Sequence, residues 1–311
     1  MNENKKVFSK IGTNYFILGI SAIIFEIILV NIIALIKPEL LHNYNSFAIL
    51  SAFSGYALPF PILLYLMRKI ESETLEKHKL TIKKFLIYAA ISLTLMWIGN
   101  IIGIAITTLI SSTTTIDVSN PVENLLNSTD IWINLILISI IGPVFEEIMF
   151  RKLLIDRTII YGPKISIILS ALMFGLFHGN LNQFFYTFLL GGFLAYVYIK
   201  TGNILHTILL HITINLTGSV VSLFVEGCIT RLVSGQVMPL DLIVVIAYGL
   251  IILTALFTGL YYLIYKYKNA KLENIKAKIS LTQPFRTVIL NYGMILFIGF
   301  CICKIILQLL G

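Results

Sequence analysis

Long apolar stretches alternate with short polar segments along the whole chain. A bilayer core about 30 Å thick is crossed by about 20 apolar residues in a helix, and nine stretches reach or approach that length. They are residues 14–36, 47–67, 85–111, 131–150, 165–179, 183–199, 203–225, 242–265 and 287–310. The strict alternation of a barrel strand is absent. The pattern therefore predicts an all-α fold, a polytopic transmembrane helical bundle with about eight or nine spans.

The amino-acid composition indicates where the protein resides. Of the 311 residues, 58% are hydrophobic and 12% are charged, whereas a soluble domain has about 45–50% apolar residues. We therefore expect a multi-pass protein of the cell membrane, surrounded by membrane lipids.

The net charge of +8 is unevenly distributed. Cytoplasmic loops of membrane proteins carry an excess of Lys and Arg. With a cytoplasmic N-terminus and nine crossings, 20 of the 23 Lys and Arg residues fall on the cytoplasmic side. The exceptions are Lys37, Arg231 and Lys304. The basic charge thus indicates a cytoplasmic N-terminus, and it gives no reason to expect a nucleic-acid partner.

A polar loop between residues 111 and 130 divides the chain. It contains no Lys or Arg, so we expect it on the outer face. The spans before it carry one intramembrane charge, Glu26, whereas almost all other ionisable and amide residues at membrane depth follow it. The predicted organisation is N-terminal helices and loops at 1–130, the working core at 131–225 and C-terminal flanking helices at 226–311.

Two adjacent carboxylates stand where the span 131–150 ends. A charge inside a bilayer is costly and commonly marks function. Glu147 and Arg151 are four residues apart, so on a helix they share a face and can form an ion pair. Glu146 is rotated by about 100° from Glu147 and has no such partner. Glu146 is therefore the candidate functional carboxylate, while the Glu147–Arg151 pair fits either support of a site or a structural ion pair.

Two later spans carry imidazoles. The sequence FGLFH ends at His178, and HITIN places His211 and Asn215 on one helix face. With a rise of 1.5 Å per residue, these groups and Glu146 spread over roughly 12 Å along the membrane normal, and helix tilt reduces this spread in part. We expect the four side chains to converge.

A carboxylate, two imidazoles and an amide in a low-dielectric pocket suit hydrolysis by an activated water molecule. Glu146 can take a proton from water while a histidine completes the hydrogen bonds of that water. His211 and Asn215 can donate to a developing oxyanion. The same Glu146, His178 and His211 also match a zinc site with one open position. The sequence leaves both a zinc cofactor and no cofactor open.

These residues resemble the CAAX-protease and bacteriocin-processing family, also called the Abi family, which is related to the Ras-converting CAAX endopeptidase. The family pattern EExxxR, FxxxH and HxxxN occurs in order at residues 146–151, 174–178 and 211–215. The resemblance covers roughly residues 140–217. Each motif alone is weak, and the three together on successive helices are specific.

The resemblance implies a hydrolase, a polytopic intramembrane protease often labelled a metalloprotease, whose catalytic core is residues 131–225. Its substrate would be a peptide or a membrane protein. Glu146 would be the general base, His178 its partner on the water, and His211 with Asn215 the oxyanion donors. Glu147 and Arg151 would shape and support the site.

Two other functions stay open from the sequence. The first is a proton-coupled transporter that uses Glu146, His178 and His211 as a relay, against which the missing internal repeat counts. The second is a non-catalytic peptide-binding or bacteriocin-immunity protein of the membrane.

Overall fold

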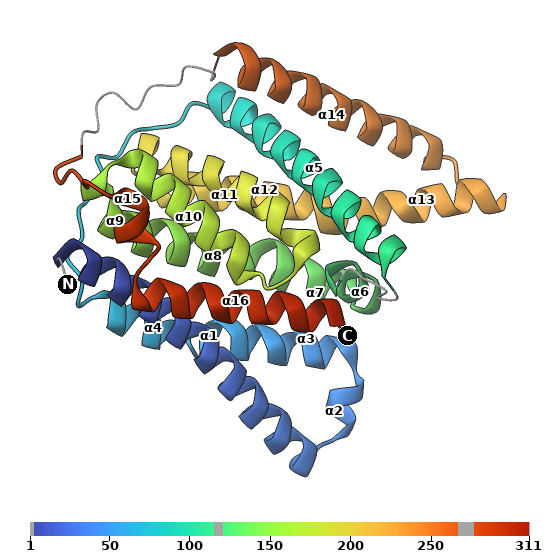
Figure 1. Cartoon of the computed structure of the whole chain (residues 1–311). Helices are drawn as coiled ribbons and strands as arrows, with labels where there is room; N and C mark the ends of the chain where they lie inside the picture. The colour runs from blue at the N-terminus through green and yellow to red at the C-terminus, as the bar shows by residue number, and fades with distance from the viewer. Residues whose placement is uncertain (1–2, 115–120, 267–276, 311) are drawn as a thin grey trace.

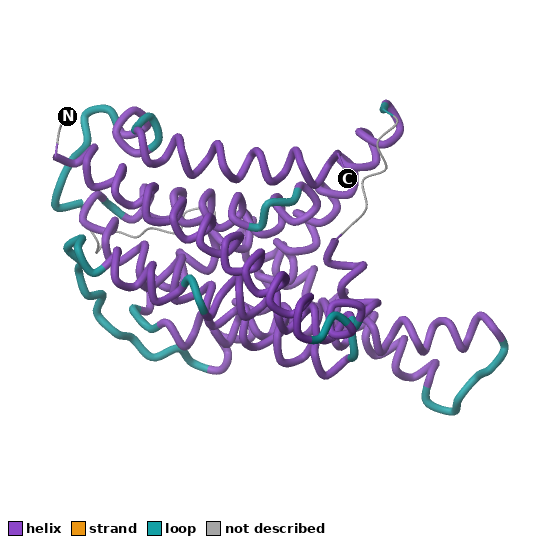
Figure 2. The backbone as a smooth tube through the Cα atoms, turned by 90° about the horizontal axis from the view of Figure 1, so that it is seen from below, coloured by secondary structure: helices purple, strands orange, loops and turns teal. Residues whose placement is uncertain are grey.

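The structure is a computed structural model that describes residues 3–114, 121–266 and 277–310. Within these residues every regular element is helical, as the tube view in Figure 2 shows. The first half comprises α1 (Glu3–Ile36), α2 (Glu39–His42), α3 (Tyr44–Ala52), η1 (Phe53–Ala57), α4 (Phe60–Met67), α5 (Ile82–Thr113), α6 (Pro121–Ser128), α7 (Ile131–Ile133), η2 (Asn134–Ile141) and α8 (Gly142–Glu147).

The second half comprises η3 (Ile148–Leu153), α9 (Leu154–Thr158), η4 (Ile159–Tyr161), α10 (Pro163–Phe177), α11 (Leu181–Thr201), α12 (Ile204–Leu216), η5 (Thr217–Val221), α13 (Ser222–Ser234), α14 (Asp241–Tyr261), η6 (Tyr262–Lys266), α15 (Pro284–Val288) and α16 (Tyr292–Leu310). The predicted all-α fold is confirmed.

Among the described residues, eight helical runs are long and apolar enough to cross a membrane. The stretch expected at 165–179 is α10, whose 15 residues rise about 22 Å and fall short of that length. Figure 1 shows α1 beginning at one end of the bundle and α16 ending at the other. The eight long runs confirm the predicted multi-pass membrane protein.

The segments predicted to be cytoplasmic gather at one end of the bundle. Phe8 near the start of α1 packs against Tyr161 with ring centroids 4.8 Å apart and the rings tilted by 46°. Three backbone hydrogen bonds join the connecting segments at this end: Glu73 N–H to Asp156 O (2.6 Å), His78 N–H to Thr201 O (2.7 Å) and Lys278 N–H to Ile160 O (2.8 Å). Most of the Lys and Arg residues that the structure describes lie in or next to these segments, so their basic charge lies on one face. The cytoplasmic assignment of that face stays a prediction.

Arg231, an exception to the charge pattern, is neutralised by a carboxylate. Its guanidinium donates to both oxygens of Asp241 at 3.0 and 2.6 Å. The Asp241 carboxylate also accepts from the Met238 backbone N–H at 2.9 Å. This pair closes the turn between α13 and α14, which projects beyond the other helices in Figure 1.

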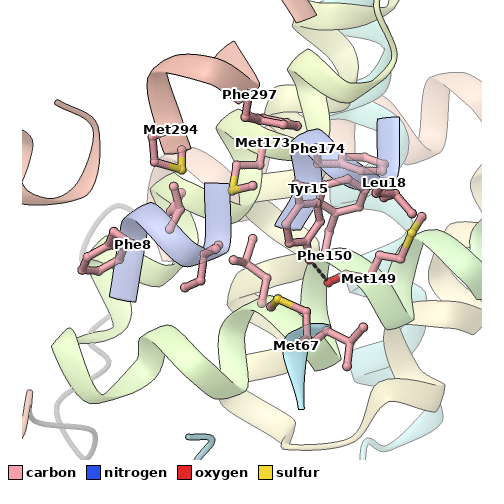
Figure 3. Packing of buried hydrophobic residues seen from close by; sticks show 14 of the residues in the cluster. Phe8, Tyr15, Leu18, Met67, Met149, Phe150, Met173, Phe174, Met294 and Phe297 are labelled. Atoms are coloured by element: carbon pink, nitrogen blue, oxygen red, sulfur yellow. Dashed lines mark hydrogen bonds between the residues drawn. The ribbon is translucent and has the colours of Figure 1, made fainter. Parts of the chain in front are cut away.

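Two large apolar clusters fill the bundle, and a smaller third one joins α9 to α11. One gathers side chains of α1, α4, η3, α10 and α16, and Figure 3 shows its centre around Tyr15, Phe150, Phe174 and Phe297. The other gathers side chains of α5, α11, α12 and α14. Helix α12, which carries His211, contributes Leu210 and Ile214 to the second cluster. The helices that carry the candidate site residues are therefore packed from both sides.

Helices α1 and α16 approach closely through two glycines. A Cβ atom on Gly12 would lie 2.4 Å from the backbone of Gly293, and a Cβ on Gly293 would lie 1.8 Å from Ser9 O. The Gly293 backbone N–H also donates to the Ser9 hydroxyl at 3.1 Å. Small residues allow helix backbones to meet in this way in membranes.

We expect Gly293→Ala to destabilise the protein, because its new methyl group has no room between the two backbones. Overpacking of this kind costs about 1–3 kcal/mol. Gly299 lies on the same helix with open space around its Cβ position, so Gly299→Ala is the matched control and should leave the melting temperature within about 2 °C. Thermal unfolding in detergent measures both, and equal melting temperatures would refute the close contact.

Candidate active site

Helix α8, which ends with Glu146 and Glu147, lies between two π-helical segments. They are η2, Asn134–Ile141, and η3, Ile148–Leu153. A π-helix bonds each N–H to the carbonyl five residues back and is widened relative to an α-helix, and such segments are frequent at functional sites. The two carboxylates thus stand on a short α-helical turn with an irregular segment on each side.

Side chains from three other helices bind backbone carbonyls of these π-helical segments. The donors are the Tyr15 hydroxyl to Met149 O (2.5 Å, Figure 3), the Ser170 hydroxyl to Phe150 O (2.8 Å) and the Asn215 amide to Ile138 O (2.9 Å). They come from α1, α10 and α12. Each bond ties the helix that carries the carboxylates to a neighbour, so its rotation is fixed from three directions.

The Glu146 carboxylate faces both imidazoles. Its Oε1 atom lies 3.9 Å from His178 Nε2, and its Oε2 atom lies 3.6 Å from His211 Nε2. The Glu146 residue is 7% exposed. Glu146 lies in α8, His178 follows the last residue of α10, and His211 lies in α12. The structure brings these three side chains together, as expected.

The other nitrogen of each imidazole determines its tautomer. His178 Nδ1 lies 2.8 Å from the Phe174 carbonyl, which can only accept, so this nitrogen carries a proton. His211 Nδ1 lies 2.9 Å from Glu147 Oε1 and likewise donates. In the neutral rings both Nε2 atoms then present lone pairs toward Glu146. Three acceptors that face one another require a donor between them, such as the O–H groups of water or an added proton.

Glu147 and Arg151 form a fully buried ion pair. Arg151 Nε lies 3.1 Å from Glu147 Oε2, and both side chains are 0% exposed. The contact does not have hydrogen-bond geometry, and within the described residues Arg151 Nη1 and Nη2 have no hydrogen-bond partner. The pair is therefore held by charge. The other carboxylate oxygen of Glu147, Oε1, positions His211. The ion pair therefore belongs to the site, and it can also stabilise the packing of the helices.

Phe174 occupies the space between the charged groups. Its ring lies under the Arg151 guanidinium at 4.4 Å, a cation–π distance. Its edges meet the rings of His178 at 4.8 Å and His211 at 5.8 Å, both in T-shaped arrangements. The aromatic residue of the FxxxH motif thus excludes water from one side of the ion pair and supports both imidazoles.

Asn215 is half-buried, and its contact differs from those of the other site residues. Its amide donates to Ile138 O in η2, on the segment that leads to Glu146. The contacts of Glu146, Glu147, Arg151, His178 and His211 join those five side chains directly. Asn215 is linked to them through the backbone of η2, and an amide has a second N–H group to offer.

The described residues do not form the zinc site considered from the sequence. Among them, no group of three or more His, Cys, Asp and Glu side chains has an arrangement that could hold a metal ion. Glu146 Oε1 already accepts a hydrogen bond from the Tyr56 hydroxyl at 2.7 Å. The spacing of Glu146 from the two imidazoles fits a hydrogen-bonded water molecule between them.

Tyr56 is a residue that the sequence analysis missed. It lies in η1, 90 positions before Glu146 in the sequence. The span that contains it, residues 47–67, has no charged residue. The chain contains 15 tyrosines, and nothing in their spacing singles this one out. The FxxxH motif did indicate that Phe174 belongs to the site. The motif alone does not predict that Phe174 contacts Arg151.

Comparison with known families agrees with the motifs. Residues 128–217 match the family described as type II CAAX prenyl endopeptidase Rce1-like. Comparison with curated proteins and with solved structures found no match. The matched segment runs from just before α7 to the end of α12 and contains Glu146, Glu147, Arg151, His178, His211 and Asn215.

The buried ion pair predicts a characteristic double-mutant cycle. Removing one partner of a buried pair leaves an uncompensated charge and costs about 3–5 kcal/mol, so Glu147→Ala and Arg151→Ala should each destabilise the protein strongly. The double variant removes both charges, and its loss of unfolding free energy should be well below the sum of the two. Thermal or denaturant unfolding in detergent measures all three variants.

The exposed pair between Lys278 Nζ and Glu73 Oε1, at 2.8 Å, provides the control. Lys278→Ala should cost about 0–1 kcal/mol because a surface ion pair contributes little. Additive losses in the Glu147 and Arg151 cycle would show that the two charges do not depend on each other.

Proposed function

We propose that this protein is an intramembrane endopeptidase, because residues 128–217 match the family described as type II CAAX prenyl endopeptidase Rce1-like. It hydrolyses a peptide bond of a peptide or membrane-protein substrate with a water molecule activated by Glu146 and His178. The observation that carries the proposal is the buried Glu146 carboxylate facing His178 Nε2 at 3.9 Å and His211 Nε2 at 3.6 Å.

The spacing of these groups suits a bridging water. A gap of 3.9 Å between Glu146 Oε1 and His178 Nε2 is too long for a direct hydrogen bond. A water molecule beside both atoms can donate one O–H to the carboxylate and the other to the imidazole lone pair. Its oxygen lone pair is then free to attack a carbonyl carbon.

The reaction follows general acid–base chemistry. As the water oxygen bonds to the carbonyl carbon, one water proton moves to Glu146 and the carbonyl oxygen becomes an oxyanion. The tetrahedral intermediate then collapses, and the C–N bond breaks. Glu146 returns its proton to the leaving amine nitrogen, so the products are a carboxylic acid and an amine.

His211 and Asn215 are the proposed oxyanion donors. His211 Nδ1 donates to Glu147, so Nε2 donates only in the doubly protonated ring. Glu146, Glu147 and Arg151 together carry one negative charge, and a proton on His211 makes this buried group neutral. The second amide N–H of Asn215 completes the pair of donors, while the first holds Ile138 O. Donors of this kind stabilise a developing oxyanion.

Substitution of the base tests the proposal. Glu146→Gln keeps the size of the side chain and removes its basicity, so peptide cleavage should fall at least about 100-fold. His178→Ala should cause a loss of similar size. The measurement is mass spectrometry of membrane peptides incubated with the purified protein in detergent.

Glu26→Gln is the matched control. Glu26 is another carboxylate within a span, but its oxygen accepts from the Ser51 hydroxyl at 3.0 Å and lies outside the cluster. This variant should keep cleavage within about twofold of the wild type. Undiminished cleavage by Glu146→Gln would refute the proposed function, as would substrate uptake driven by a proton gradient with no cleavage.

A chelator tests the cofactor question separately. Because the described side chains do not form a metal site, we expect cleavage to stay within about twofold after treatment with EDTA and removal of the chelator. Loss of cleavage that is restored by added Zn²⁺ would contradict the metal-free reaction.

A further inference from the structure

Tyr56 contacts the proposed base from outside the family segment. It lies in η1, Phe53–Ala57, whereas the family match begins at residue 128. Its hydroxyl donates to Glu146 Oε1 at 2.7 Å. Of the described residues, Tyr56 is the one that places a donor within hydrogen-bond distance of the Glu146 carboxylate, since both imidazole nitrogens lie beyond 3.5 Å.

Aromatic packing sets the direction of this hydroxyl. The Tyr56 ring stacks on Phe145 with centroids 5.7 Å apart and an interplanar angle of 21°. Phe145 is held in turn by Phe60, edge to face, at 5.0 Å. Tyr56 therefore contacts two consecutive residues of α8: its ring packs on Phe145, and its hydroxyl donates to Glu146.

A glutamate at this place needs such a contact. The terminal torsion of a Glu side chain is broad, because rotation about its sp³–sp² bond meets no deep staggered wells. Without a donor the carboxylate could turn away from either imidazole. A hydrogen bond to a charged acceptor is short and about twice as strong as a neutral one, so Tyr56 can hold one carboxylate oxygen while the group still faces both rings.

The neighbouring tyrosine does not duplicate this contact. Tyr186 of α11 is close enough for Glu146 to act on it electrostatically. Its hydroxyl instead accepts a hydrogen bond from Gln183 Nε2 at 2.6 Å. His178 and His211 face Glu146, and Arg151, Tyr186 and the adjacent Glu147 lie nearby, but Tyr56 is bonded to the carboxylate itself.

We propose that Tyr56 is a positioning residue of the active site: its hydroxyl holds Glu146 Oε1 so that the carboxylate faces the water shared with His178. The proposal rests on the proposed function of Glu146 as the base. It extends the active site beyond residues 128–217 to a helix of the N-terminal part of the chain.

The test compares Tyr56→Phe with Tyr198→Phe. The Tyr198 hydroxyl also donates to a carboxylate, Asp156 Oδ1, at 2.8 Å. Asp156 lies on the same helical run as Glu146, ten residues further on. Each variant loses one phenol–carboxylate hydrogen bond within this run, but only Tyr56→Phe loses the bond to the base. We expect Tyr56→Phe to lower kcat about 10- to 100-fold with KM within about twofold.

Tyr198→Phe should keep kcat and KM within about twofold of the wild type, even where it lowers the melting temperature. Tyr56→para-aminophenylalanine replaces the hydroxyl with another donor at the same ring position, and it should restore kcat to within about fivefold. This variant also serves as the test where the phenylalanine variant does not fold.

The outcomes separate the two proposals. Absence of cleavage by the wild type, or full cleavage by Glu146→Gln, would overturn the proposed function. Cleavage by the wild type together with an unchanged kcat in Tyr56→Phe would overturn the positioning role alone. The same conclusion would follow from a raised KM at constant kcat, or from equal losses of kcat in Tyr56→Phe and Tyr198→Phe.

Discussion

A guanidinium group buried within a membrane bundle needs an anion or backbone carbonyls beside it, and Arg151 meets this requirement with Glu147. Both side chains are inaccessible to solvent, and their atoms Nε and Oε2 lie 3.1 Å apart. The other oxygen of Glu147 is then available to His211 Nδ1 at 2.9 Å. The charge that stabilises Arg151 therefore also sets the orientation and tautomer of an imidazole, which presents its second nitrogen to Glu146.

The adjacency of the two glutamates follows from this constraint. Consecutive residues on a helix point in directions about 100° apart. With Glu147 fixed against Arg151, Glu146 must leave the helix on a different side, where His178, His211 and Tyr56 lie around it. The π-helical segments on either side of α8 fix this direction, because side chains of α1, α10 and α12 hold their backbone carbonyls.

The helices could be predicted from the sequence because each span is a long run of apolar residues. The i, i+4 relation of Glu147 and Arg151 was also readable, as were the family motifs that bring Glu146, His178 and His211 together. The number of spans could not be fixed because of the short helix α10. Hydropathy does not distinguish a helix that is buried by protein from one that faces lipid. Tyr56 and the Ile138 contact of Asn215 could not be found, since both depend on packing between helices that no local pattern encodes.

The contact between Gly12 and Gly293 has a consequence for biosynthesis. Helix α1 is translated well before α16, yet the two backbones fit against each other so closely that no side chain separates them. The apolar face that includes Phe8, Tyr15 and Leu18 must wait in the membrane for Met294 and Phe297 to emerge from the ribosome. During that interval lipid or an insertion factor has to cover the first helix, and the interior of the bundle closes only when the partner helix arrives.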